Sequence, residues 1–208
     1  MSGGEELREP QPASEEDAAR AHCYALIGRL FYDAPDSILL AQLCRAEVAA
    51  GADGAPLAQA WQALRDACGT AYPVVLKQEY DTLLVGVGKS EVTPYTSHYL
   101  SKDIAPDRHL VQLRQQLEHL GLGRRTAASE VEDHVSVVCD VMRFLIEGAR
   151  PLSEQRLFFK DFVYPGATGF CDAVKKATSA SFYRHVAGFA RAFLDVEREA
   201  FEMEDADA

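Results

Sequence analysis

Apolar side chains recur every three or four residues along most of this chain, and this spacing constrains the fold more than any other feature of the sequence. The pattern is plainest near the C-terminus, where Phe182, Phe189 and Phe193 fall on one face of a single helix. A strand with one buried face needs strict alternation of apolar and polar residues, and no stretch sustains it. The sequence therefore predicts an all-α protein.

We expect a single globular bundle of about nine or ten helices with short links. Ser14 is placed to cap the first helix, and Ser129 with Glu132 has the pattern of a capping box before a long, apolar and therefore central helix. Pro165 and Gly166 predict a break. The expected helical ranges are 15–34, 36–50, 57–67, 73–84, 110–120, 131–147, 157–162 and 181–203, with a turn at 51–54.

The chain is expected to divide into a short tail and one folded domain. Residues 1–14 carry Gly, Glu, Pro and Ser with almost no apolar content, which is typical of a disordered acidic tail. Residues 15–208 form the helical domain, with an N-terminal part to about residue 100 and a C-terminal part after it.

The formal net charge of -11 limits the classes of partner. Nucleic acid is not expected as a partner, because neutralising phosphates needs a basic surface. A basic partner would instead be attracted. No apolar run approaches the ~20 residues of a membrane span, and the N-terminus lacks the basic and apolar regions of a signal peptide. We expect a cytoplasmic protein with no stable membrane insertion.

The five cysteines contain no CxxC pair and are odd in number, which indicates reduced thiols rather than a disulfide framework. Neither they nor the six histidines cluster at ligand spacing, so no metal site is expected. The phosphate-loop, dinucleotide and HExxH motifs are also absent. Asp133 beside His134 could suit a catalytic base, but acidic residues at a helix start also stabilise the helix dipole.

The most unusual stretch is VTPYTSHY at residues 92–99, which is rich in aromatic rings and hydroxyls although it connects two helical segments. Rings and hydroxyls on non-helical backbone can form an apolar cleft with a polar edge, which suits an extended peptide. The alternative is a packed loop whose tyrosine rings are buried.

Several stretches together resemble the TorD/DmsD/NarJ family of redox-enzyme maturation chaperones. EYDTLLVG at 79–86 is similar to that family's Glu-aromatic-x-x-Leu-Phe-x-Gly segment, and PYTSHY at 94–99 to its Pro-aromatic-x-Ser-x-Tyr loop. Asp133-His134 resembles its Asp-His motif, and FF at 158–159 with SFY at 181–183 its C-terminal pattern. The chain departs from the family at Leu84, where Phe is common, at Tyr95, where some members have Trp, and at Pro165-Gly166, which lacks a following Trp.

The resemblance implies a TorD-like helical fold and a cytoplasmic chaperone that is not an enzyme and holds no cofactor of its own. Such proteins bind the precursor of a molybdenum-cofactor oxidoreductase, often at its twin-arginine leader peptide, until the cofactor is inserted. The positions that the resemblance implies for peptide binding are Tyr80, Asp81, Leu84, Pro94, Tyr95, Ser97, Tyr99, Asp133 and His134.

An acidic protein with carboxylates beside an aromatic cleft would suit a leader peptide that carries two arginines followed by an apolar run. Asp81 and Asp133 are the expected partners of the guanidinium groups, and Tyr80, Tyr95 and Tyr99 those of the apolar part. Residues 92–99 would then form a groove wall facing the helix start at Asp133. Two alternatives are a permanent helical adaptor subunit of a redox complex and a nucleotide hydrolase built on the Asp-His pair.

Overall fold

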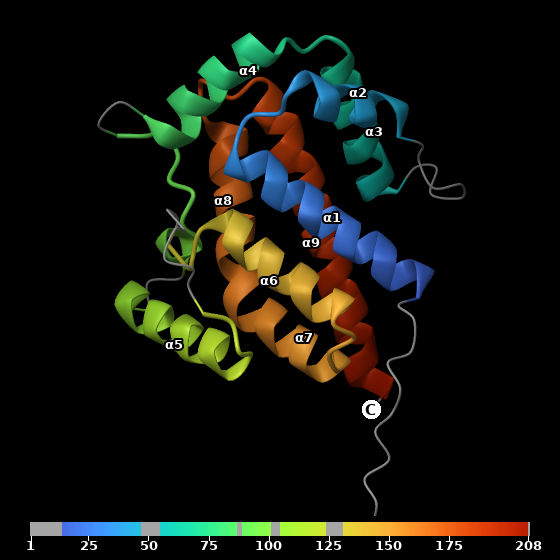
Figure 1. The fold of residues 1–208 in the computed structure, drawn as a ribbon, viewed down its shortest axis with the longest axis vertical. Coiled ribbons are helices and arrows are strands. Elements are labelled where there is room, and N and C mark those ends of the chain that lie inside the picture. The colour runs from blue at the N-terminus through green and yellow to red at the C-terminus, as the bar shows by residue number, and fades with distance from the viewer. Residues whose placement is uncertain (1–13, 47–54, 87–88, 101–104, 124–130, 208) are drawn as a thin grey trace, which may run out of the picture.

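The computed structural model describes residues 14–46, 55–86, 89–100, 105–123 and 131–207, and within them the chain is helical (Figure 1). The described residues hold nine α-helices, which confirms the expected all-α class and helix number. Their bounds are α1 Glu15–Tyr32, α2 Ser37–Arg45, α3 Pro56–Gly69, α4 Pro73–Tyr80, α5 Pro106–His119, α6 Val135–Glu147, α7 Leu152–Phe158, α8 Tyr164–Lys176 and α9 Phe182–Asp207. Two π-helical turns, η1 Asp81–Val85 and η3 Phe159–Val163, and a 3-10 turn, η2 Thr96–Tyr99, complete the set.

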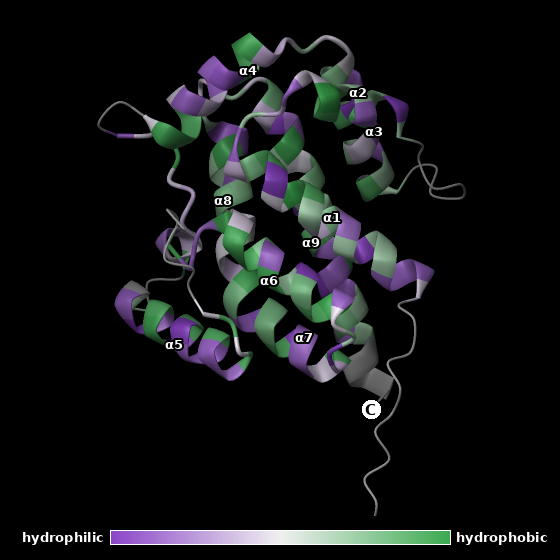
Figure 2. Cartoon of the chain, viewed as in Figure 1, coloured by the Kyte–Doolittle hydropathy of each residue, from purple (hydrophilic) through white to green (hydrophobic). Residues whose placement is uncertain are grey.

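The core lies between two layers of helices, with α1 and α6 in front and α8 and α9 behind them (Figures 1 and 2). Aromatic rings join these layers edge to face: Tyr24 meets Phe193 at 4.9 Å between ring centroids, and Phe31 meets Phe170 at 4.8 Å. All these rings are buried, and truncating one such ring to Ala typically costs about 3–5 kcal/mol. The apolar stripes of the sequence therefore become the contacts between the central helices.

A buried ion pair also ties α1 to α9. The Glu197 carboxylate is 3% exposed and accepts hydrogen bonds from Arg20 Nε at 2.8 Å, a second Arg20 nitrogen at 3.0 Å and the Tyr24 hydroxyl at 3.0 Å. Both carboxylate oxygens are thus paired, which offsets the cost of removing the charge from water. The pair fixes how α1 lies along α9.

Ser14 caps the first helix as predicted, since its side chain accepts a hydrogen bond from the Asp17 backbone N–H at 3.0 Å. The predicted start of the central helix is wrong. It begins at Val135, capped by His134, and the residues between Val131 and His134 turn before it. Ser129 lies outside the described residues, as do the tail at 1–13 and the turn at 51–54.

The break predicted at Pro165 and Gly166 is also wrong, because both residues lie in the first turn of α8, a helix that the sequence reading did not include. Proline is tolerated there, since the first N–H groups of a helix have no partner within the helix. The chain therefore runs through α7, η3 and α8 without leaving helical conformation. The second helix is shorter than predicted and ends at Arg45.

Candidate functional site

Residues 94–99 lie against the start of α6 and are held there by backbone hydrogen bonds. The Thr96 N–H donates to the Asp133 carbonyl at 2.8 Å, and the Val135 N–H donates to the Pro94 carbonyl at 2.9 Å. These bonds form an isolated antiparallel bridge between Tyr95 and His134. Segments that are some forty residues apart in sequence therefore share one site, and the loop faces the helix start as the sequence analysis expected.

Asp133 and His134 are mostly shielded from solvent, and their side chains hold this junction together. The Asp133 carboxylate is 3% exposed and accepts a hydrogen bond from the Ser97 hydroxyl at 2.5 Å. His134 Nδ1 caps α6 by accepting from the Ser136 N–H at 3.2 Å, and its ring meets the Tyr95 ring edge to face at 5.7 Å. Both side chains therefore help to hold the loop in place.

A shallow pocket of about 290 Å³ opens at this junction. It is lined by Thr93, Tyr95, Ser97, His98, Val131 and Asp133. His98 is exposed, and Tyr95 and Ser97 are half-buried. The pocket therefore offers aromatic area, a hydroxyl and an imidazole beside a carboxylate that is held by Ser97.

Pro94 and Tyr99 anchor the loop from behind. Pro94 is buried, and the Tyr99 hydroxyl donates to the Thr93 carbonyl at 2.7 Å while its ring meets Phe170 at 6.0 Å. Burial raises the pKa of Tyr99 to about 12, against the opposing effect of the hydrogen bond to Thr93. The structure therefore brings six of the nine predicted residues together, two of them as supports of the loop: Pro94, Tyr95, Ser97, Tyr99, Asp133 and His134.

Tyr80, Asp81 and Leu84 lie in a different region, at the end of α4 and in η1, and line none of this pocket. The side chains of Tyr80 and Leu84 are buried, and the Tyr80 hydroxyl donates to the Tyr32 carbonyl at 2.5 Å. The Asp81 side chain is 48% exposed and pairs with Lys77 at 2.5 Å. Of these three, only Asp81 presents a group to solvent.

Gly166 and Gly169 make room for the loop, and the sequence analysis did not connect them to the site. A Cβ at Gly166 would lie 2.5 Å from the Thr96 carbonyl oxygen, and one at Gly169 would lie 2.6 Å from the Tyr99 Cβ. Both glycines sit on one side of α8, three residues apart, and η2 packs directly on that side. The spacing GxxG at 166–169 was the available signal, and the reading of Pro165-Gly166 as a break concealed it.

A carboxylate from the N-terminal part of the chain, that of Glu79, holds the start of α9. Glu79 accepts hydrogen bonds from the backbone N–H groups of Ser181 at 2.8 Å, Phe182 at 3.1 Å and Tyr183 at 2.8 Å. The first N–H groups of a helix need such acceptors, and a negative charge there also favours the helix dipole. Glu79 therefore acts as an external cap, which gives the first residue of the 79–86 motif a structural task.

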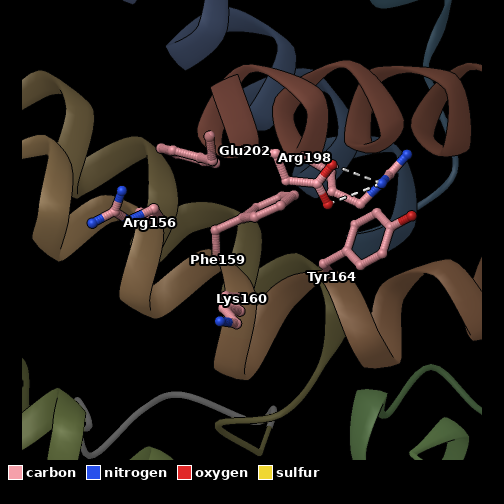
Figure 3. Close-up of a pocket in the computed structure, with 7 residues that line it drawn as sticks. Arg156, Phe159, Lys160, Tyr164, Arg198 and Glu202 are labelled. Carbon is pink, nitrogen blue, oxygen red and sulfur yellow. Dashed lines mark hydrogen bonds and ion pairs between the residues drawn. The ribbon is translucent and has the colours of Figure 1, made fainter. Parts of the chain in front are cut away.

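A second cavity of about 300 Å³ lies between η3, α8 and α9 (Figure 3). It is lined by Arg156, Phe159, Lys160, Tyr164, Arg198, Phe201 and Glu202. Arg198 is paired with Glu202 at 3.0 Å, and the Tyr164 hydroxyl donates to Asp195 at 2.9 Å. None of the predicted site residues reaches this cavity.

Three of the described cysteines, Cys23, Cys68 and Cys171, have thiols of raised pKa. Burial raises the pKa of Cys23 and Cys68 to about 11 and that of Cys171 to about 12, so these thiols stay protonated near neutral pH.

Across the part of the chain that the structure describes, no group of three His, Cys, Asp or Glu side chains is arranged to hold a metal ion. None of the described helices is both long and apolar enough to cross a membrane.

Comparison with known proteins identifies the family. A family model described as nitrate reductase delta subunit matches residues 51–195, which is well over half of the chain. The chain belongs to this family, the NarJ/TorD type of redox-enzyme maturation chaperone. The match includes the loop at 94–99, the start of α6 and the first turns of α9.

One solved structure is similar along nearly the whole length of both chains. It is the crystal structure of a proposed redox enzyme maturation protein from Archaeoglobus fulgidus, with 20% sequence identity and a TM-score of 0.49 over 94% of this chain and 99% of that one. No curated protein matches the chain. The family match alone therefore carries the assignment that this is a redox-enzyme maturation chaperone, which partners a redox-enzyme subunit.

Proposed function

We propose that this protein binds, in the cytoplasm, the precursor of a molybdenum-cofactor oxidoreductase through its twin-arginine leader, and holds it until the cofactor is inserted. The observation that carries the proposal is the pocket between residues 93–98 and Asp133, where Tyr95, Ser97 and His98 reach the surface on a loop fixed by backbone hydrogen bonds. A loop that is already ordered loses little entropy when it binds a flexible peptide.

The charge of the protein supports a basic ligand. A net charge of -11 attracts a leader that carries adjacent arginines, and this attraction acts mainly on the rate of encounter. Contact at the pocket itself then depends on the tyrosine ring and the hydroxyl, because the Asp133 carboxylate is largely shielded. The protein performs no chemistry of its own in this scheme.

The first test is a pull-down of the tagged full-length chain from its native cytoplasm, with mass spectrometry of the co-eluting proteins. Recovery of an unprocessed precursor that still carries its leader and lacks its cofactor is the expected result. Recovery of only the mature enzyme in a stable complex would instead support a permanent adaptor subunit. Turnover of a nucleotide that is lost in His134→Ala would support a hydrolase.

The second test places the ligand on the protein. Tyr95→Ala with Ser97→Ala should weaken binding of the recovered leader peptide by about tenfold, which corresponds to ~1.4 kcal/mol, while helicity by circular dichroism stays unchanged. Tyr72→Ala is the matched control, since Tyr72 is an exposed tyrosine that precedes α4, outside the pocket. Unchanged affinity in the double variant would reject this pocket as the leader site.

A further inference from the structure

A polar groove of about 550 Å³ lies between α5 and the helices of the C-terminal part, and none of the predicted site residues lines it. One wall is α5, which contributes Gln112, Gln115, Gln116 and His109. Gln112 lies three residues before Gln115 and four before Gln116, so these glutamines are neighbours on the helix surface, while Leu113 and Leu117 beside them are buried. The groove therefore presents a row of side-chain amides.

His109 supplies an unmet hydrogen-bonding group inside this groove. The side chain is 4% exposed, its ring packs at 5.4 Å from Phe162, and its Nε2 has no hydrogen-bond partner among the described residues. Burial lowers the pKa of His109, against the opposing effects of Asp133 and Asp161, so the ring is neutral near pH 7. A buried polar atom without a hydrogen-bond partner destabilises the fold, so a ligand that pairs with Nε2 would remove this penalty.

The opposite wall comes from α7, η3 and α8 and carries one charge of each sign. Lys160 and Asp161 lie side by side in η3 and bring charges of opposite sign. Leu157, Phe162 and Pro165 give apolar area between them. A groove with one charge of each sign, side-chain amides and apolar area matches an uncharged chain better than an ion or a charged cofactor.

The groove is a neighbour of the loop pocket. The helix α5 contacts η2, the 3-10 turn that carries Ser97 and His98. The carboxylate of Asp133, which lines the loop pocket, also acts electrostatically on His109 in the groove. One extended peptide could therefore occupy both.

We infer that this groove binds an uncharged, extended stretch of the client's leader, continuous with the part held at the loop pocket. A glutamine amide carries both donors and an acceptor, which match the N–H and C=O groups of a peptide backbone. His109 Nε2 would complete the set by pairing with one backbone group. The inference rests on the proposed function. It adds a second contact, which recognises the backbone and the length of the leader peptide and not its arginines.

The test compares synthetic peptides on the full-length chain by fluorescence anisotropy. The short probe holds two adjacent arginines and a brief apolar run, and the long probes carry in addition an alanine and serine extension on one side or the other. At least one extension should tighten binding by about tenfold, or ~1.4 kcal/mol. Gln112→Ala with Gln116→Ala should abolish that gain, whereas Gln62→Ala, an exposed glutamine of α3, should leave it unchanged.

A second measurement follows His109 directly by its imidazole nitrogen resonances. The Nε2 resonance should shift with the extended peptide that binds more tightly and stay in place with the short one. No gain from either extension, a gain that persists in the double glutamine variant, or an unmoved Nε2 resonance would each overturn the inference.

The same data separate this inference from the proposed function. If only extended peptides bind, and the glutamine variant weakens them, the groove stands and the loop pocket fails as the arginine site. If the short peptide binds and extensions add nothing, the proposed function stands and the groove fails. If no peptide binds, both are rejected.

Discussion

The two regions that carry the family-like motifs are built in opposite ways. At the loop junction, backbone hydrogen bonds from Thr96 and Val135 hold residues 94–99, so that the side chains of Tyr95 and Ser97 stay partly accessible. At the end of α4, the side chains themselves are used: Glu79 caps α9, and Tyr80 and Leu84 are buried. Residues of one motif set therefore divide into those that can meet a partner and those that hold the two parts of the chain together.

The largest effect in this comparison should come from Gly166→Ala. The added Cβ would lie 2.5 Å from the Thr96 carbonyl, and neither backbone can yield easily, so we expect a loss of about 1–3 kcal/mol in the free energy of unfolding. Because the loop must move, leader binding should weaken as well. Denaturant unfolding and peptide titration measure the two effects.

The matched control is Gly188→Ala in α9. Nothing lies within 4 Å of a Cβ at that position, so alanine should raise stability by roughly 0.5–1 kcal/mol through helix propensity. If both variants gave the same change in stability and binding, close packing of η2 on α8 would not be what positions the loop.

Glu79→Ala should act on the other region and leave binding intact. It removes the acceptor of three backbone N–H groups at the start of α9, and we expect a loss of about 1–2 kcal/mol in the free energy of unfolding. The folded fraction should still bind the leader with unchanged affinity, because the loop pocket is held separately. Gln78→Ala, its exposed neighbour in α4, is the control. A loss of affinity in folded Glu79→Ala would mean that the two regions act as one site.

Glu91 should make the stability of the α8–α9 connection depend on pH, because it binds residues Thr178 and Ser179 there. Its hydrogen bonds from the Ser179 hydroxyl and the Thr178 and Ser179 backbone hold the pKa of the carboxyl below its usual value of 4.5. A depressed pKa in the folded state gives stability that is present above pH 4.5 and is lost as the pH falls through the folded-state pKa. Melting temperatures of Glu91→Gln should therefore lie below those of the parent at pH 7 and converge with them in acid. A gap that persisted in acid would assign the effect to packing instead.

These contrasts show which parts of the molecule could be predicted from the sequence. The apolar spacing of Phe182, Phe189 and Phe193 was sufficient for α9, because local periodicity reports one helix face. The start of α6 was placed too early, because a local capping pattern competed with a cap that His134 provides together with the loop. The resemblance supplied the site residues, but it did not separate those at the pocket from those in the core.

The contacts that separate them join residues far apart in the chain. Glu79 meets the N-terminus of α9 across about a hundred residues, and no local pattern indicates such a partner. The space that Gly166 leaves for Thr96 is likewise visible only when α8 and η2 are seen together. Long-range contacts of this kind were therefore beyond what periodicity and motif order could establish.

The smallest expected effect is the salt dependence of leader binding, which distinguishes Asp133 from Asp81, the two aspartates expected to pair with the leader arginines. Asp133→Asn should weaken leader binding equally at low and high salt, because the side chain is 3% exposed and acts by holding Ser97 at 2.5 Å. Asp81→Asn should leave stability within about 0.5 kcal/mol, since its pair with Lys77 is exposed. We expect it to slow association only two- to threefold at low salt and not at all at high salt, because an exposed charge at a distance is screened within about 10 Å at 0.1 M salt.

Stopped-flow association and equilibrium titration over a salt series measure both aspartate variants. A salt-dependent loss in Asp133→Asn would show that its carboxylate meets an arginine directly, in spite of its burial. A large, salt-dependent loss of affinity in Asp81→Asn would place an arginine at the end of α4. That result would join the two regions into one extended leader site, because the pocket at residues 93–98 and the turn at η1 would then be bound by the same peptide.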